Sequence, residues 1–370
     1  MLAAVCYEFG KPLVVEEIDL DPPGPGEVRV RLAAVGVCHS DLNLVRGQWA
    51  GWAAPPPVVA GHEGAGVVAE VGPGVMGLKP GDRAVVSLLR WCGRCFFCAA
   101  GAPHLCEGKF ALATEKRLHN RRGEPLNQGI STGAFAEYVV VDQSQVIPVG
   151  EGMPLDRACL LACGVITGVG AVLNTAQAPP GSSVVVIGTG GVGLNTVQGA
   201  RLAGANPIIA IDVLDHKLRA ARDFGASHTI NGRVEDARKI VRGLTGGRGA
   251  DFVFVAAAST AAAAQGLKLA RRGGAIVLVG MPNSGESAPL DVADFVWRGQ
   301  RVLGSNVGST LPGIDVPKLA ELYGQGRLRL DELITARYPL TEINAALDSL
   351  ERGEALRNVL VLAPELLEAA

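Results

Sequence analysis

Residues 183–193, with the sequence SVVVIGTGGVG, decide the fold of this chain. Val184–Ile187 is a continuous run of β-branched residues, typical of a buried strand, and the residues after the turn are expected to form a helix reaching about Ala203. The turn between them has the pattern G-x-G-G-x-G and contains Gly188, Gly190, Gly191 and Gly193. Glycines there allow a tight turn and let the backbone approach a pyrophosphate at the helix N-terminus. The stretch therefore predicts a dinucleotide-binding site.

Asp212 ends the next expected strand, Pro207–Asp212. A carboxylate at that point hydrogen-bonds the adenosine ribose hydroxyls of a dinucleotide and repels a 2′-phosphate, so it predicts NAD rather than NADP. The alternative is a glycine-rich turn that binds no ligand. We disfavour it because the strand, the turn, the helix, the second strand and its terminal acid all agree.

Strands and helices continue to alternate after this unit, which indicates βαβ units and a doubly wound parallel sheet. The further strands are expected at Ser227–Ile230, Asp251–Val255 and Gly274–Gly280, and the helices at Leu214–Phe224 and Thr260–Leu269. Residues 1 to about 150 instead show short alternating runs such as Glu27–Leu32 between Gly and Pro turns, which predict a small antiparallel barrel or sandwich. A helix near Val316–Gln325 and a strand at Asn358–Leu362 are expected at the end.

The composition narrows the class of protein. The 370 residues suggest two or three domains, and 48% hydrophobic against 19% charged residues can bury a large core. The net charge of −2 gives no basic excess for nucleic acid or an anionic membrane. The start has no signal-peptide pattern, and the longest weakly polar stretch, 158–173, is too short and too rich in glycine to span a membrane. We therefore expect a cytoplasmic protein.

Four of the eight cysteines follow the spacing C-x2-C-x2-C-x7-C, at Cys92, Cys95, Cys98 and Cys106. In a reducing cytosol such a cluster favours metal ligation over disulfides, and four thiolates on a short lobe match a closed, structural zinc site. An iron–sulfur cluster and free thiols are the alternatives, and the long last gap without a following proline disfavours the cluster. Because a closed site leaves no open coordination position, we expect no chemistry at this metal.

Cys38, His62 and Cys163 are candidates for a second metal site. Two cysteines and one histidine are a known ligand set for a catalytic zinc with an open fourth position. The three residues lie far apart in the sequence, however, and composition alone cannot bring them together. Taken alone, Cys163 would be interpreted as a buried core cysteine.

Several motifs together resemble the zinc-dependent medium-chain alcohol dehydrogenases. In chain order they are GVCHSD at 36–41, GHEGAG at 61–66, the four-cysteine lobe, Cys163-Gly164, the glycine turn at 188–193 and LRNV at 356–359. The resemblance runs from about residue 5 to 362. It implies a chaperonin-10-like (GroES-like) β-barrel catalytic domain at 1–164 with the zinc lobe at 88–110, a Rossmann NAD-binding domain at 165–306, and a return to the catalytic domain at 307–370.

The resemblance also implies NAD and two zinc ions per chain. The catalytic zinc would be held by Cys38, His62 and Cys163, and the structural zinc by the lobe. Asp41 would orient the ligand His62. Glu63 would lie near the metal, with a purely structural salt bridge as the alternative. Ser40 would accept the proton of the substrate hydroxyl and pass it toward the nicotinamide ribose.

Other implied contacts concern the coenzyme. His39 and Arg357 would contact the pyrophosphate, Thr167 the nicotinamide and Lys217 the adenosine ribose. Asn43 is a departure, because many family members carry at this position the histidine that ends the proton relay. An amide cannot act as a base, so proton exit would use water or His39.

These residues predict a zinc oxidoreductase that transfers a hydride between an alcohol and NAD, giving an aldehyde or ketone. The alternative in the same fold oxidises a thiol adduct of formaldehyde, although Phe110 stands where glutathione-dependent relatives carry an arginine. A catalytically idle regulatory protein is disfavoured by the complete ligand set with Ser40. A zinc-ribbon nucleic-acid binder is disfavoured by the missing basic excess.

The assembly and the substrate are also expectations. The segment between Cys106 and Phe135 is long, as in dimeric members of the family, so we expect a homodimer, with a tetramer as the alternative. Leu88 and either Trp49 or Trp52 are candidates to line an apolar channel for a small-molecule alcohol or aldehyde.

Overall fold

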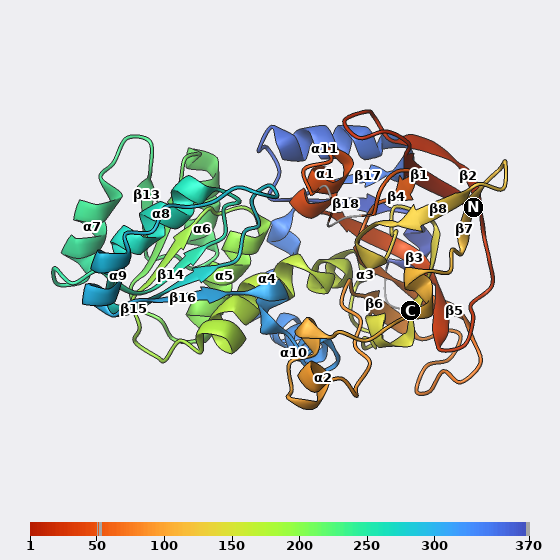
Figure 1. The fold of residues 1–370 in the computed structure, drawn as a ribbon, viewed down its shortest axis with the longest axis horizontal. Coiled ribbons are helices and arrows are strands. Elements are labelled where there is room, and N and C mark those ends of the chain that lie inside the picture. The colour runs from red at the N-terminus through yellow and green to blue at the C-terminus, as the bar shows by residue number, and fades with distance from the viewer. Residues whose placement is uncertain (50, 52–53, 368–370) are drawn as a thin grey trace. The chain divides into compact units, whose positions relative to one another are not determined.

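The chain forms two compact units (Figure 1). The computed structural model describes residues 1–49, 51 and 54–367. The split unit comprises Met1–Cys163 and Leu311–Ala370, and the inserted unit comprises Gly164–Thr310.

The split unit contains a closed barrel with the strand order β1-β2-β7-β8-β4 and a sheet with the order β10-β6-β5-β3-β18-β17, in which β9 also pairs with β3. The expected antiparallel barrel or sandwich is confirmed, although β4 pairs with β8, and β17 with β18, in parallel. The strands are β1 (Leu2–Cys6), β2 (Val14–Leu20), β3 (Glu27–Val37), β4 (Val58–Val59), β5 (Glu63–Val71), β6 (Arg83–Val86), β7 (Leu118–Asn120), β8 (Pro125–Gln128), β9 (Tyr138–Asp142), β10 (Val146–Pro148), β17 (Ile334–Pro339) and β18 (Arg357–Val361). The helices are α1 (His39–Val45), α2 (Phe96–Ala99), α3 (Leu155–Ala158), α10 (Pro312–Gly324) and α11 (Ile343–Glu351).

Strand β3 is longer than the expected run Glu27–Leu32. Its first half alternates between buried valines and the partly exposed Arg29 and Arg31, as a half-buried strand should. Its second half is buried on both faces and pairs with β18, which comes from the other end of the chain. Because that partner is remote in sequence, local alternation could not predict where β3 ends.

The inserted unit is a parallel sheet with the strand order β13-β12-β11-β14-β15-β16. The chain starts in the middle and winds outward to both edges, so the expected doubly wound sheet is confirmed. The strands are β11 (Val184–Ile187), β12 (Ile208–Asp212), β13 (His228–Asn231), β14 (Ala250–Val255), β15 (Ala270–Leu278) and β16 (Arg301–Gly304). The helices are α4 (Gly164–Gly170), α5 (Gly191–Leu202), α6 (Asp215–Asp223), α7 (Ala237–Leu244), α8 (Thr260–Leu269) and α9 (Val292–Arg298).

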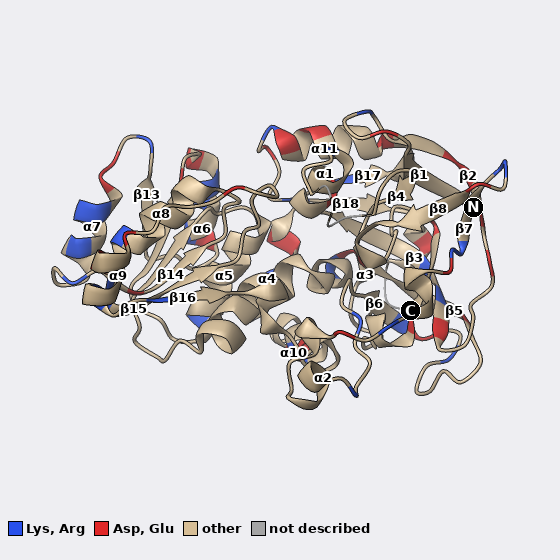
Figure 2. Ribbon diagram, in the orientation of Figure 1, with Lys and Arg blue, Asp and Glu red and all other residues tan. Residues whose placement is uncertain are grey.

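The core of the inserted unit consists mainly of Val, Ile and Ala side chains of the sheet, with Ala237 and Val241 of α7 and Leu269 of α8 packed against them. Acidic and basic segments alternate over most of the chain (Figure 2), in keeping with the net charge of −2. Within the described residues, no single helix is long and apolar enough to cross a membrane. A bent pair, Leu155–Ala162 with Gly164–Ala176, reaches that length and composition only when its two parts are taken together.

Candidate functional site

The register between β3 and β5 places Cys38 beside His62. The two strands are antiparallel, and Gly36 pairs with Glu63. Cys38 follows the last residue of β3 and His62 precedes the first residue of β5, so both lie at the same end of the pair. A Cβ at Gly36 would collide with the Glu63 carboxylate, so this register requires glycine there.

Asp41 connects these two segments through one carboxylate. Its Oδ1 accepts hydrogen bonds from the Gly61 N–H at 3.0 Å and from His62 Nδ1 at 2.8 Å, and its Oδ2 accepts the Cys38 N–H at 3.0 Å. The side chain is fully buried. Because Nδ1 of His62 is engaged by this carboxylate, Nε2 is the ring nitrogen left to face a metal.

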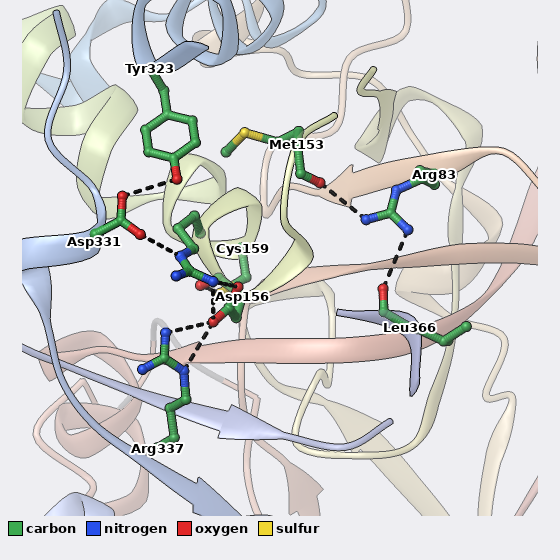
Figure 3. Close-up of polar contacts among 9 residues, drawn as sticks. Arg83, Met153, Asp156, Cys159, Tyr323, Asp331, Arg337 and Leu366 are labelled. Atoms are coloured by element: carbon green, nitrogen blue, oxygen red, sulfur yellow. Dashed lines mark hydrogen bonds and ion pairs between the residues drawn. The ribbon is translucent and has the colours of Figure 1, made fainter. Parts of the chain in front are cut away.

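Cys163 arrives from a third segment, through α3 and the 3₁₀ turn that follows it. Asp156 on α3 is 1% exposed and accepts two hydrogen bonds from Arg157 and two from Arg337, at 2.7 and 3.0 Å in each case. Figure 3 shows Arg337 reaching this carboxylate and Tyr323 reaching Asp331. Arg157 also donates to Asp331, at 2.8 Å. The network anchors the segment that carries Cys163.

These three segments form a cluster of possible metal ligands. One ligand atom from each of Cys38, His62, Glu63 and Cys163 lies within 4.8 Å of the others, and all four residues are buried. Two thiols and an imidazole are typical zinc donors. The structure thus brings together the three residues expected to bind the catalytic zinc, and their role as ligands stays a prediction.

The surroundings of Cys38 favour its thiolate, which is the form that binds a metal. A hydrogen bond from Cys163 holds the pKa of Cys38 well below its usual value, against burial and with help from His62 and Arg357. For His62, burial opposes the charged form, but Asp41 and Cys38 outweigh it and raise its pKa to about 10. A metal binding here would therefore displace a proton from Nε2.

Glu63 makes a second contact at this edge of the sheet. Arg357 directly precedes Asn358, which pairs with Val37 in the β18–β3 ladder, and its Nη2 forms a buried ion pair with Glu63 Oε2. The other oxygen, Oε1, is buried, has no hydrogen-bond partner among the described residues and lies 4.0 Å from His62 Nε2. An unsatisfied carboxylate oxygen in this position fits a site that takes a cation. The expected contact of Arg357 with a pyrophosphate stays a prediction.

The four lobe cysteines also converge, with Sγ atoms within 4.8 Å of one another. Cys106 Sγ accepts backbone N–H groups from Cys92 at 3.3 Å and Gly108 at 3.2 Å. Backbone hydrogen bonds from Cys98 and Glu107 lower the pKa of Cys95 to about 6, whereas burial raises the pKa of Cys106 to about 12. Four converging sulfur atoms with backbone N–H donors around them fit a structural zinc.

The glycine turn forms an open cradle at the start of α5. Gly188 has φ +88°, and a Cβ on it would lie 2.8 Å from the Ala257 nitrogen. A Cβ on Gly193 would collide with the Gly188 carbonyl, which fixes the close approach of helix and strand. At Gly190, the N-cap of α5, a Cβ would meet no described atom within 4 Å. Tight packing on one side and open space at the first residues of a helix fit a pyrophosphate.

Asp212 is fixed beside this turn. Its Oδ2 accepts the Thr189 N–H at 2.7 Å, and its Oδ1 accepts the Val213 N–H at 2.7 Å. Thr167 Oγ1 on α4 is buried and has no hydrogen-bond partner among the described residues, so it can bond to a ligand. Lys217 is half-buried on α6. The expected coenzyme contacts of these residues stay predictions.

Three of the remaining candidates lie on α1. His39 is exposed, Ser40 and Asn43 are half-buried, and all three belong to this one helix. Their roles in proton transfer stay predictions. Trp49 and Leu88 are half-buried, and Trp52 lies outside the described residues.

The side chains that hold these segments in place have no local signal in the sequence. Arg337 follows Asp156 by 181 residues, and no local pattern marks the pair. Arg90, next to the lobe, donates to Gln145 Oε1 at 2.8 Å and to the Ser131 carbonyl at 2.7 Å. Charged residues like these are usually exposed, so their sequence neighbourhoods offer no signal of such contacts.

Comparison with known proteins gives matches in both units. Residues 24–151 match the alcohol dehydrogenase GroES-like domain, and residues 191–323 match the zinc-binding dehydrogenase domain. The putative alcohol dehydrogenase D of Mycobacterium tuberculosis is 36% identical, over 97% of this chain and 99% of that protein. The S-(hydroxymethyl)glutathione dehydrogenase of Saccharomyces cerevisiae is 37% identical, over 97% and 95%. The crystal structure of benzyl alcohol dehydrogenase from Acinetobacter calcoaceticus has a TM-score of 0.90 and 31% identity, over 98% of this chain and 99% of that one.

Proposed function

Because this chain belongs to the zinc-dependent medium-chain alcohol dehydrogenase family, we propose that it transfers a hydride between a small apolar alcohol and NAD, with two zinc ions per chain. The zinc-dependent alcohol oxidoreduction expected from the sequence is confirmed by these relatives, as is the doubly wound domain inserted into a GroES-like domain. The family uses zinc and a nicotinamide coenzyme on small-molecule substrates.

The observation that carries the proposal is the buried cluster around Cys38, His62 and Cys163, with an unsatisfied Glu63 oxygen beside it. A bound zinc supplies a Lewis acid that lowers the pKa of the alcohol hydroxyl, and the nicotinamide accepts the hydride. Cys38, Cys163 and His62 Nε2 would hold the metal, and Asp41 keeps the imidazole and the Cys38 backbone oriented toward it. The Arg357 ion pair engages one Glu63 oxygen, and a set of two cysteines and one histidine would leave a fourth position for the substrate.

Proton release would begin at Ser40, two residues after the first ligand. Its hydroxyl can accept the proton of the substrate and release its own proton to the next acceptor. Asn43 cannot extend this relay as a base, so the proton would leave through water or through the exposed His39.

NAD is the proposed coenzyme because Asp212 is held beside the glycine turn by backbone N–H groups. A carboxylate in that position suits ribose hydroxyls and disfavours a 2′-phosphate. We also infer a cytoplasmic homodimer, with residues 1–164 and 307–370 as the catalytic domain and residues 165–306 as the coenzyme domain. These inferences rest on the resemblances described above and on the long segment after Cys106.

The test combines metal content with activity. Elemental analysis of the purified protein should find two zinc ions per chain, and NADH should form with benzyl alcohol and other apolar primary alcohols. One zinc per chain would overturn the two-site proposal. Absence of NADH formation across a panel of alcohols would overturn the proposed activity.

A thiol adduct of formaldehyde is the second candidate substrate, favoured by the yeast relative that acts on S-(hydroxymethyl)glutathione. Against glutathione, the half-buried Phe110 carries no charge for a carboxylate, and the neighbouring Arg90 already donates to Gln145 Oε1 and to the Ser131 carbonyl. NADH formation with formaldehyde should be compared with and without glutathione and other thiols. Turnover only with an added thiol would replace the simple-alcohol proposal.

A further inference from the structure

A large basic hollow lies on the inserted unit. Its volume is about 860 Å³, within the range of small-molecule sites. α7, α8, α9 and the first residues of β14 and β15 line it. Its lining includes Arg238, Arg242, Arg248, Lys268, Arg272 and Trp297.

The positive charge of the basic hollow is largely uncompensated. Of its two carboxylates, Asp251 is paired with Arg271 at 2.5 Å, and Asp294 lies 3.6 Å from Arg298. The cations of Arg238, Arg242 and Lys268 form no ion pair with another described residue. Figure 2 shows basic residues gathered on α7. A chain with a net charge of −2 thus concentrates unpaired cations around one concave surface, where their field attracts anions.

An exposed aromatic side chain completes the lining. Trp297 on α9 is 73% exposed, and the Arg272 guanidinium lies 5.2 Å from its ring centroid. An indole and a guanidinium plane are the groups on which nucleobases stack, and the same guanidinium can bond to phosphate oxygens.

The hollow is separate from the coenzyme cradle within the same unit. It lies where β14 and β15 begin, at Ala250 and Ala270, whereas the glycine turn follows the end of β11. β11 and β14 are parallel neighbours, with Val184 paired to Phe252. The basic hollow and the glycine turn therefore lie at opposite ends of these strands. The four residues of β11, at about 3.3 Å each, separate the two ends by ~13 Å of backbone.

We propose that the basic hollow binds a compact, multiply charged phosphate compound at a site distinct from the coenzyme site. Three unpaired cations around one hollow suit several closely spaced phosphate charges, which bidentate guanidinium groups bind well. A long nucleic acid is disfavoured, because the basic residues form one compact patch rather than a continuous track. The phosphate could belong to a nucleoside triphosphate, whose base would use Trp297, or to an inorganic polyphosphate, which would not.

Isothermal titration of the zinc-loaded protein, saturated with NAD to block the coenzyme site, tests this site with ATP and with inorganic tripolyphosphate, both without Mg²⁺. We expect one equivalent of at least one of the two probes to bind, with affinity falling as salt is raised. Tighter binding of ATP that Trp297→Leu abolishes would identify a nucleotide site. Equal binding of the two probes would identify a polyphosphate site.

Two variants on α7 provide a matched pair. Arg242→Gln and Lys239→Gln each remove one exposed positive charge from the same helix, but only Arg242 lines the hollow. Arg242→Gln should weaken binding of the probe by about tenfold, and Lys239→Gln by less than about twofold. Binding of neither probe would overturn the proposal, and so would equal weakening by the two variants. Alcohol oxidation by both variants should match the parent protein.

Discussion

Replacing Asp41 with asparagine tests whether one buried carboxylate organises the candidate metal site. The carboxylate accepts three hydrogen bonds, from Cys38 N–H, Gly61 N–H and His62 Nδ1, at 2.8 to 3.0 Å. An amide of the same size keeps one oxygen, and its NH2 group must then face at least one of these donors. Leaving that buried donor without an acceptor should cost about 1–3 kcal/mol of stability.

The same change should also weaken metal binding. Misorienting His62 and the Cys38 backbone should weaken zinc binding by about 10–100-fold, the usual effect of removing a carboxylate that supports a ligand histidine. The assay is competition with a chelator, with zinc counted per chain by elemental analysis. Asp41→Asn should lose one zinc at chelator concentrations at which the parent chain keeps two.

The cysteine lobe and a surface carboxylate provide the controls for this prediction. The lobe shares no hydrogen bond with Asp41, so the zinc retained by Asp41→Asn should be the lobe zinc. Asp348→Asn, at an exposed position on α11, should leave both metals unchanged. If Asp41→Asn kept both zinc ions with an affinity within threefold of the parent, the inferred role of this carboxylate would be refuted.

Three further predictions concern the anchor of α3, the coenzyme and the proton relay. Asp156→Asn should lower the free energy of unfolding by about 3 kcal/mol, the low end for a broken buried ion pair, because Arg337 can turn to solvent. Asp331→Asn, at a more exposed ion pair, should lower it by less than about 1 kcal/mol. Urea unfolding measures both changes. A loss below about 1 kcal/mol for Asp156→Asn would contradict the anchoring role. Asp212→Gly should raise kcat/KM for NADP relative to NAD by about tenfold or more, and an unchanged ratio would remove this carboxylate from coenzyme choice. Asn43→His should change the rate and the pH optimum of alcohol oxidation, and a steady-state pH profile identical to that of the parent would contradict the relay argument.

The parts of the site that could be predicted from the sequence are those whose residues lie close together along the chain. In the glycine turn, a few positions determine which backbone atoms approach one another, and the flanking strand and helix have clear periodicity. The lobe is similar, because Cys92 and Cys106 close a short loop whose spacing alone suggests four convergent thiols. Cys38, His62 and Cys163 needed the resemblance to a family, since nothing local relates them.

Contacts between remote segments depended on strand register and packing. Glu63 and Arg357 are 294 residues apart and meet because β5 and β18 flank the same end of β3. The arginines around Asp156 and the cations of the basic hollow are scattered in the sequence, and the net charge of −2 conceals the hollow entirely. Short-range sterics and periodicity suffice to predict the two classes of domain, the glycine turn and the convergence of the four lobe cysteines from the sequence. Only the tertiary structure decided which buried charges pair and where unpaired cations gather, because those depend on which distant surfaces the folded chain brings within a few ångströms.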